Sequence, residues 1–212
     1  MRPDAEILWE VASGLARAAV EVSRPPLPLP PLLFFTDPER TPRPWETAAA
    51  LPTGSGVVFR HFAASDAIET ADRLRQVTSQ NEIRLLIGLD IALAKAVGAD
   101  GVHLPERALG QAGALRAAQP DWLVTGAVHS AQALSGASSL HAAILSPVFP
   151  AGGASATRPA LGGGRLAELV RLSPCPVYAL GGIHAGNAHE LAGSGVVGLA
   201  GVEAIQAAFG PA

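Results

Sequence analysis

The sequence predicts a (β/α)8 barrel of the TIM type with an extra helix at its N-terminus. From residue 32 onward, eight short apolar runs alternate with eight helical stretches, and strict alternation of this kind is typical of parallel strands. The length of 212 residues suits one barrel near the short end of the usual range. Hydrophobic residues make up 49% and aromatic residues only 5%, which fits buried parallel strands covered by helices rich in small residues.

A closed barrel is favoured over an open, doubly wound sheet. Eight strand–helix pairs are enough to close, and no glycine-rich dinucleotide fingerprint opens the first pair. No linker divides the chain after Pro31. We therefore expect residues 1–31 to form a helix and a proline-rich strap, and residues 32–212 to form the barrel domain.

The first expected element is a helix over residues 4–22, where apolar residues such as Leu8, Val11 and Leu15 recur at helical spacing. The proline-rich stretch that follows, residues 24–31, cannot be helical and is expected to be extended. Because function in barrels lies at the carboxyl ends of the strands, this helix is expected to cover the opposite end as a lid.

The remaining elements are short apolar runs bounded by glycine, proline or polar residues, and stretches with one apolar face. Ser130 has the side chain to cap the helix that follows it. The strands are expected at residues 32–37, 56–61, 84–88, 101–104, 122–128, 142–146, 176–183 and 195–200. The helices are expected at residues 46–51, 67–77, 90–97, 109–118, 130–134, 165–172, 187–192 and 203–209.

Composition excludes several classes of function. Charged residues are only 16%, the net charge is -3, and no Lys/Arg run occurs, which argues against nucleic acid or an anionic membrane as partner. The single Cys175 excludes an intrachain disulfide framework. No apolar run is long enough to span a membrane, and acidic residues near the N-terminus interrupt any signal-peptide core, so a cytoplasmic location is expected. No cofactor is expected, and a homodimer is compatible with the sequence.

The last two strands predict an anion site. The seventh ends at two glycines, and the eighth ends at a glycine beside a helix start, so backbone N–H groups can approach a phosphate. Loops after the seventh and eighth strands of such barrels hold phosphate in this way. The alternative is two glycine turns without a ligand. The residues expected to bind phosphate are Gly181, Gly182, Ile183, Ala200, Gly201 and Val202.

Other strand ends bring polar side chains to the same mouth. Arg60 is the best partner there for a carboxylate or phosphate, because its guanidinium binds either bidentately; the alternative is an ion pair at the rim. The sequence leaves open on which side of its strand His61 lies. His141, His184 and His189 are expected to be solvated. Carboxylates are few, and no convergent set of oxygen ligands for a metal is visible.

Three motifs resemble the thiamine phosphate synthase superfamily. Gly101–Leu104, which follows Val97–Asp100, is similar to the central motif of that family. Ser146–Pro150 with Arg158–Gly162, and the turn Ala179–Ile183, are similar as well. The resemblance runs from about residue 32 to residue 206 and implies a TIM barrel. It also implies one of two branches: a synthase that joins a pyrimidine diphosphate to a thiazole phosphate with magnesium, or the TenI branch, which aromatises a thiazole carboxylate phosphate without metal.

The synthase pattern is only partly retained. Of the Gln-x-Arg-x-Lys motif that ends the second strand of synthases, only Arg60 remains. Gly88 and Leu89 stand where synthases have Asn-Asp, and the aspartate that binds magnesium falls near Ala108. The resemblance therefore implies that the magnesium and diphosphate ligands of the family are missing.

The end of the fifth strand resembles the TenI branch instead. The motif there is Gly126–Ser130, and the resemblance implies that His129 moves the proton during tautomerisation, a task that suits an imidazole because histidine titrates near neutral pH. The alternative is a histidine that only forms hydrogen bonds at the barrel rim. Ser130 and Ser146 are expected to contact the substrate, and His103 to be structural. Three functions remain open: a TenI-like tautomerase, a thiamine phosphate synthase with an altered metal site, and a barrel that binds a phosphorylated small molecule without catalysis.

Overall fold

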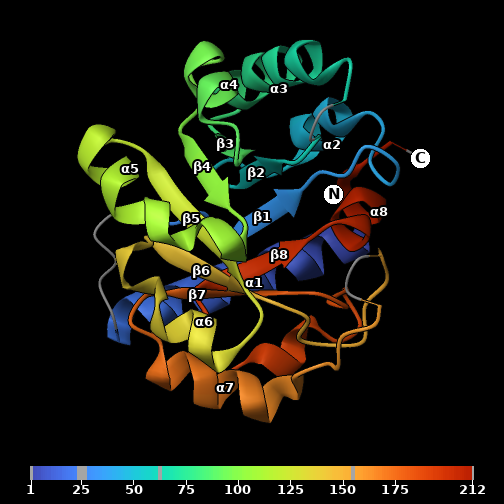
Figure 1. Cartoon of the computed structure of the whole chain (residues 1–212). Helices are drawn as coiled ribbons and strands as arrows, with labels where there is room; N and C mark the ends of the chain where they lie inside the picture. Colours follow the sequence, from blue (N-terminus) through green and yellow to red (C-terminus); the bar gives the residue numbers. More distant parts are fainter. Residues whose placement is uncertain (1, 23–27, 62–63, 154–155, 212) are drawn as a thin grey trace.

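The computed structural model describes residues 2–22, 28–61, 64–153 and 156–211. Its strands form one closed parallel barrel in chain order, in which β8 pairs with β1, so the predicted (β/α)8 barrel is confirmed (Figure 1). The strands are β1 (Leu32–Phe35), β2 (Gly56–Phe59), β3 (Arg84–Gly88), β4 (Gly101–Leu104), β5 (Leu123–Val128), β6 (Ala142–Leu145), β7 (Val177–Leu180) and β8 (Gly198–Gly201).

Helices surround the strands, and their bounds mostly agree with the expected ranges to within a few residues. The α-helices are α1 (Pro3–Val22), α2 (Pro44–Ala50), α3 (Ala67–Gln80), α4 (Ile91–Ala96), α5 (Ala112–Ala118), α6 (Ala131–Ser135), α7 (Gly162–Leu172) and α8 (Glu203–Phe209). The short 3-10 helices among the described residues are η1 (Glu106–Gln111), η2 (Ala137–Ser139) and η4 (Ala188–Leu191).

The core has two layers because successive residues of a strand point to opposite faces. In β1, Leu33 and Phe35 point into the barrel, where they pack with inner residues of other strands such as Tyr178. Leu32 and Phe34 point outward and pack beneath the helices. The barrel interior is therefore a filled core with no channel, and ligands have access only from its ends.

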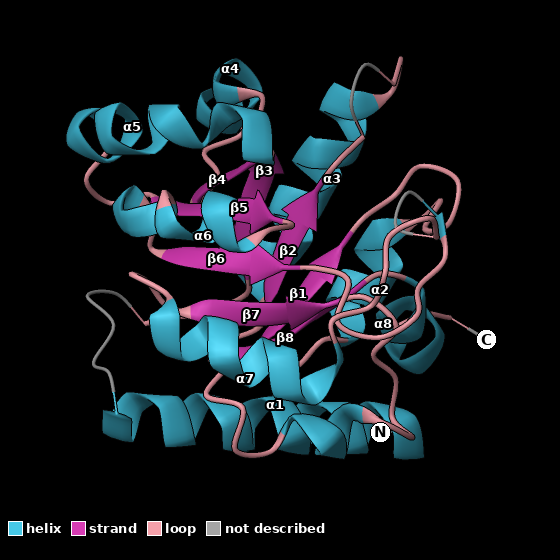
Figure 2. Cartoon of the chain, turned by 60° about the horizontal axis from the view of Figure 1, so that its bottom comes forward, coloured by secondary structure: helices cyan, strands magenta, loops and turns pink. Residues whose placement is uncertain are grey.

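Helix α1 lies along the outside of the barrel and does not cover its end, so the predicted lid is wrong (Figure 2). It packs against β8, α8 and η4 through an apolar stripe that includes Leu8 and Leu15. The physical reason lies between β7 and β8, where the chain forms only the four-residue η4 and leaves the outer face of β8 uncovered. Among the described side chains of α1, Ala19, one turn beyond Leu15, joins the inner layer.

Two further expectations need correction, and one falls partly outside the described residues. Helix α7 begins at Gly162 and not at residue 165, because packing overrides the low helix propensity of its first three glycines. His141 is buried, and its Nδ1 accepts a hydrogen bond from the Val124 N–H, so it is not solvated. The first half of the expected strap, residues 24–27, lies outside the described residues. Its end is fixed where the buried Tyr178 hydroxyl donates to the Pro30 carbonyl at 2.6 Å.

Within the described ranges, no helix combines the length and apolar character that crossing a bilayer requires.

Candidate functional site

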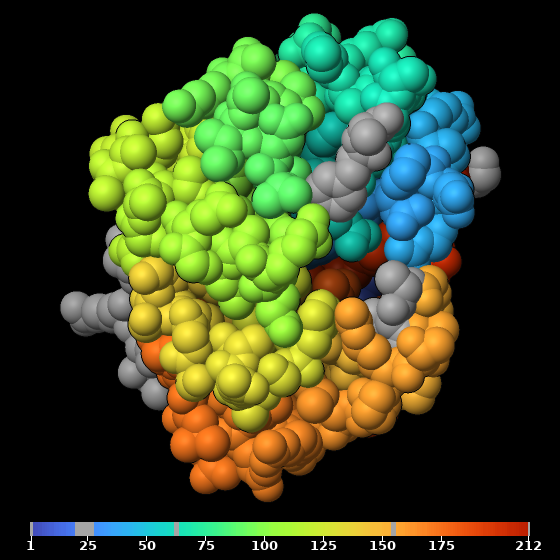
Figure 3. Space-filling model, viewed as in Figure 1, coloured from blue at the N-terminus to red at the C-terminus, as the bar shows by residue number. Residues whose placement is uncertain are grey.

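A pocket of about 550 Å³ opens at the carboxyl ends of the strands, and we call it the mouth pocket. In the space-filling view it lies in the hollow bordered by segments from the first, middle and last parts of the chain (Figure 3). All six residues expected to bind phosphate line this pocket, and so does Arg60. The other residues that line it are Arg40, Phe149, Pro150, Ala151, Gly152, Leu180, His184, Asn187, Glu203 and Ala204.

The turn after β7 depends on its two glycines for steric reasons. Gly181 and Gly182 have φ angles of 101° and 67°, which side chains rarely adopt. A β-carbon on Gly182 would overlap the carbonyl oxygen of Pro150, and one on Gly181 would lie 2.9 Å from Pro147 Cα. The close approach of the β6–α7 loop therefore requires glycine here, whether or not an anion binds.

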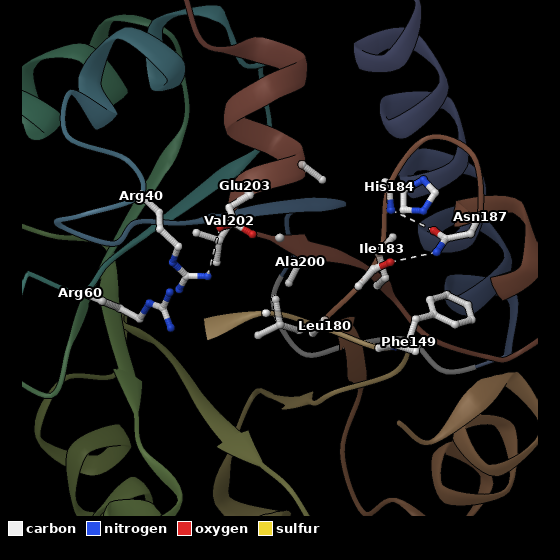
Figure 4. Close-up of a pocket in the computed structure, with 17 residues that line it drawn as sticks. Arg40, Arg60, Phe149, Leu180, Ile183, His184, Asn187, Ala200, Val202 and Glu203 are labelled. Carbon is white, nitrogen blue, oxygen red and sulfur yellow. Dashed lines mark hydrogen bonds and ion pairs between the residues drawn. The ribbon is translucent and has the colours of Figure 1, made fainter. Parts of the chain in front are cut away.

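Asn187 holds this turn in place, a role that no sequence pattern indicated. Its Nδ2 donates to the Gly182 carbonyl at 2.8 Å, and its Oδ1 accepts from the His184 N–H at 2.8 Å (Figure 4). These two bonds use one backbone carbonyl and one N–H of the turn. The orientation of the peptide groups that face the mouth pocket is thereby fixed before any ligand enters.

Arg60 supplies a buried positive charge to the mouth pocket. Its Nε donates to the Thr36 carbonyl at 3.0 Å, and its guanidinium lies 5.1 Å from the centre of the Phe35 ring. Burial lowers the Arg60 pKa to about 10, which still leaves the group charged at neutral pH. Its buried Nη2 has no hydrogen-bond partner among the described residues. Arg60 therefore lines the mouth pocket as a charged group, while Nη2 itself has almost no exposed surface.

Arg40, from the loop after β1, is a second cation that the sequence patterns did not indicate. Its Nη2 donates to Asp37 Oδ2 at 2.7 Å, and its Nη1 lies 3.9 Å from Glu203 Oε1. The hydrogen bond from Arg40 is the main cause that lowers the Asp37 pKa to about 2. Figure 4 shows both guanidinium groups directed into the pocket from the same side. The sequence could have indicated Arg40 through its place in the loop after the first strand, because every loop that follows a strand faces the mouth of the barrel.

The two arginines, more than the start of α8, provide the positive charge of the pocket. Helix α8 has seven residues and begins at Glu203, whose carboxylate lines the mouth pocket. A carboxylate in the first turn offsets the partial positive charge of a helix start for an incoming anion. Arg40 lies within ion-pair distance of that carboxylate and compensates for part of its charge.

His129 lies at the β5–β6 side of the barrel mouth and is not among the residues that line the mouth pocket. Its Nδ1 lies 3.0 Å from the Ser146 carbonyl oxygen and 3.1 Å from the Ser146 hydroxyl. A carbonyl oxygen can only accept, so Nδ1 carries the proton in this arrangement. Nε2 is then an acceptor, and Arg158 Nη1 lies 3.3 Å from Nε2 and 3.4 Å from Nδ1. Glu106 fixes the backbone by accepting from the His129 N–H at 2.7 Å.

The other expected site residues have local structural partners. Ser130 is exposed and caps α6 by accepting from the Ala133 N–H, so its hydroxyl does not face the mouth pocket. Ser146 is buried, and its hydroxyl contacts His129. His103 is buried with Nδ1 3.0 Å from the Thr125 hydroxyl, and burial, with the nearby Arg60 and His129, lowers its pKa to about 3. His103 is therefore neutral and buried, and its expected structural role stays a prediction.

The residues present do not fit a magnesium site. Within the described ranges, no three His, Cys, Asp or Glu side chains gather closely enough to hold a metal ion. Gly88, Leu89 and Ala108 stand at the positions where the resemblance places magnesium ligands. Asp90 lies beside them, but its Oδ1 accepts from the Leu93 N–H as the cap of α4. Magnesium requires several convergent oxygen ligands, and these positions do not offer them.

Comparisons with known proteins agree on one family. A family model described as thiamine monophosphate synthase matches residues 33–205. A thiamine-phosphate synthase of Albidiferax ferrireducens is 32% identical over 148 residues, which cover 69% of this chain and 68% of the relative. One from Laribacter hongkongensis is 31% identical over 170 residues, 78% of this chain and 81% of the relative.

Solved structures share the fold. A thiamine phosphate pyrophosphorylase from Pyrococcus furiosus superposes with a TM-score of 0.69 and 23% identity, covering 84% of this chain and 91% of that one. FabK from Thermotoga maritima superposes with a TM-score of 0.61 at 15% identity, over 91% of this chain and 65% of that one. At these identities, the superpositions establish the barrel and nothing finer.

Proposed function

Because this chain belongs to the thiamine monophosphate synthase family, we propose that it acts in thiamine biosynthesis by binding a thiazole phosphate in the mouth pocket. One observation carries the proposal: the two glycine-containing turns and the guanidiniums of Arg40 and Arg60 line the same pocket. Backbone N–H groups and guanidinium forks are the two donor types that proteins use most for phosphate. The pocket volume of about 550 Å³ lies in the range of small-molecule sites.

The names of the curated relatives favour coupling as the reaction, which joins a pyrimidine diphosphate to the thiazole phosphate. The described residues do not form the magnesium site that synthases of this family use. Coupling here would require side-chain cations to hold the diphosphate. Arg40 and Arg60 line the mouth pocket, and Arg158 lies beside His129, so these three are the candidates. The proposal therefore involves no step through a metal.

Tautomerisation is the second candidate, and the geometry of His129 favours it. The bond from Nδ1–H to the Ser146 carbonyl makes Nε2 the proton acceptor of the ring, and a substrate proton would replace the Arg158 guanidinium that lies beside it. The Arg158 guanidinium beside Nε2 would stabilise negative charge on a substrate carboxylate or enolate. A thiazole ring held by its phosphate in the mouth pocket would have to extend toward His129 for this reaction.

One experiment with three arms separates these functions. The purified chain is incubated with pyrimidine diphosphate and thiazole phosphate, with and without Mg²⁺, and thiamine phosphate is measured by chromatography. A second arm follows conversion of the thiazole carboxylate phosphate tautomer, and a third measures binding of each compound by calorimetry. Coupling predicts product in the first arm, and tautomerisation predicts conversion only in the second. Binding without turnover would support a repurposed barrel, and absence of binding to every phosphate would contradict the proposal.

A further inference from the structure

Glu203 supplies a carboxylate to the lining of the mouth pocket, beside the groups expected to bind phosphate. Arg40 and Arg60 are positive there, while Glu203 and Asp37, which pairs with Arg40, are negative. These two positive and two negative formal charges cancel. A phosphate therefore enters a pocket whose arginines are already matched by carboxylates, unlike a site with a large excess of positive charge.

The two carboxylates contact Arg40 in different ways. Asp37 accepts a 2.7 Å hydrogen bond from Nη2 and does not line the mouth pocket. Glu203 Oε1 lies 3.9 Å from Nη1, within ion-pair range but longer than a hydrogen bond, and Figure 4 shows the two side chains next to each other. Asp37 therefore orients the guanidinium, whereas Glu203 lies where a ligand oxygen can take its place at Nη1.

Gly153, in the loop after β6, limits where the Arg40 guanidinium can move. A β-carbon on Gly153 would lie 3.0 Å from Nη1 and 3.2 Å from Cζ of Arg40, so the loop backbone lies close to the guanidinium. The group is thus bordered by the loop after β1, the loop after β6 and the start of α8. A ligand phosphate has to compete with Glu203 for Nη1 at this position.

The charge of Glu203 acts on Arg40 although its side chain is 64% exposed. The hydrogen bond to Asp37 is the main cause that raises the Arg40 pKa, and the charge of Glu203 also raises it. The same negative charge repels an incoming anion, and Coulomb repulsion grows in proportion to the charge of that anion. Ligands with more negative charge are therefore disfavoured more strongly.

We propose that Glu203 is a specificity-determining residue of the mouth pocket. Its carboxylate competes with a ligand phosphate for Arg40 and disfavours ligands that carry more negative charge than one phosphate monoester. This inference rests on the proposed phosphate site and adds the class of ligand that the site prefers. Of the three arginines available for a diphosphate, Arg40 is then the least suited, because a second carboxylate lies beside it.

The binding test uses three esters of the thiazole alcohol whose phosphate is the proposed ligand. The sulfate, phosphate and diphosphate esters carry charges of about −1, −2 and −3 at about pH 8. Calorimetry compares the parent with Glu203→Gln, which keeps the shape of the side chain and removes its charge. We expect the variant to bind about twofold more tightly for each unit of ligand charge, which is about two-, four- and eightfold along the series.

Three controls accompany this series. Glu82→Gln removes the same charge from an exposed residue just before β3, at the opposite end of the barrel, and should bind like the parent. An increase in salt from about 0.05 M to about 0.5 M should reduce the gain, because salt screens exposed charges. In an Arg40→Gln background, the gain for the phosphate ester should fall below about twofold, because no guanidinium remains to compete for. Far-ultraviolet circular dichroism checks that each variant is folded.

Three results would overturn the proposal. The first is binding to folded Glu203→Gln that is no tighter than to the parent. The second is a gain of the same size for all three esters, which would indicate a change of shape and not of charge. The third is a gain that persists in full in the Arg40→Gln background.

Inorganic phosphate separates this proposal from the proposed function, and NMR of backbone amides labelled with ¹⁵N follows its binding. If Glu203→Gln tightens the binding of inorganic phosphate while no thiazole ester binds, the role of Glu203 is supported and the thiazole ligand is wrong. If neither inorganic phosphate nor any ester binds to the parent or to the variant, both proposals are overturned.

Discussion

The guanidinium of Arg40 donates a 2.7 Å hydrogen bond to the carboxylate of Asp37 in the wall of the mouth pocket. Asp37 also accepts from the backbone N–H groups of Glu39 and Arg40, so the carboxylate is held by the same loop that it orders. Both side chains are about a quarter exposed. The pair therefore directs the Arg40 guanidinium toward the pocket. Because both side chains are partly exposed, the positive charge of Arg40 stays accessible to a ligand.

Replacement of Asp37 by Asn tests this orientation. The amide cannot hold the guanidinium as strongly, so we expect thiazole phosphate to bind about three- to tenfold more weakly by calorimetry.

The Asp37 pKa lies at about 2 in the folded chain, below the ordinary aspartate value of 3.8. Because the folded pKa is the lower one, the pair stabilises the fold above about pH 4, and this stabilisation is lost as the pH falls through 2. Urea unfolding should show a parent–variant difference that is constant above about pH 5 and shrinks in acid.

Two substitutions of Arg60 distinguish the contribution of its charge from that of its bidentate guanidinium geometry. Arg60→Ala removes a buried charged donor, and a hydrogen bond of this kind is worth about 1.5–3 kcal/mol, or about 10- to 150-fold in phosphate affinity. Arg60→Lys keeps the charge but cannot bind bidentately, so an intermediate loss is expected. Calorimetric titration with thiazole phosphate measures both. Equal affinity in parent and Arg60→Ala would place the phosphate away from this side chain.

Alanine substitutions at Gly182 and Gly98 distinguish the cost of backbone strain from the cost of steric overlap. Both have similar positive φ angles, 67° and 62°, but a β-carbon on Gly98 meets nothing within 4 Å. Gly98→Ala should therefore cost only the conformational strain, about 1 kcal/mol of unfolding free energy. Gly182→Ala also overlaps the Pro150 carbonyl, and we expect it to cost at least about 2 kcal/mol more. Urea unfolding measures both, and similar losses would mean that the Pro150 loop moves away freely.

His129→Asn tests the second candidate function. If His129 transfers the proton in tautomerisation, the rate should fall by about 10²–10⁴ while thiazole phosphate affinity stays within a few-fold. Asn retains a donor for the Ser146 carbonyl, so the local structure should persist. Single-turnover assays on the thiazole carboxylate phosphate provide the rate. An unchanged rate would remove His129 from the mechanism.

The barrel and the position of its mouth could be predicted because they depend on patterns in the sequence. Apolar runs such as Val57–Phe59 specify buried strands, and alternation with helices specifies their parallel order. The glycines that follow β7 and the glycine that ends β8 could be placed in one pocket for the same reason, since neighbouring strand ends lie side by side. The phosphate itself stays a prediction.

The rest depends on contacts between segments distant in the sequence. Arg40 and Asn187 lie in loops, and no periodicity marks a loop residue whose side chain reaches a pocket. The buried state of His141 comes from a hydrogen bond to Val124 on a neighbouring strand. The stripe on α1 was visible, but a stripe shows only that a face is buried and not which surface covers it.

Because α1 completes the layer outside β8, this helix leaves the ribosome well before the strand on which it packs. Arg2 also donates to the Gly210 carbonyl, which brings the two chain ends together (Figure 1). Contacts of such large sequence separation raise contact order and slow folding, so an incomplete nascent chain holds the apolar face of α1 without its partner. A circular permutant that starts at β1 and continues from α8 into α1 would make this contact local, and it would fold faster with the same barrel.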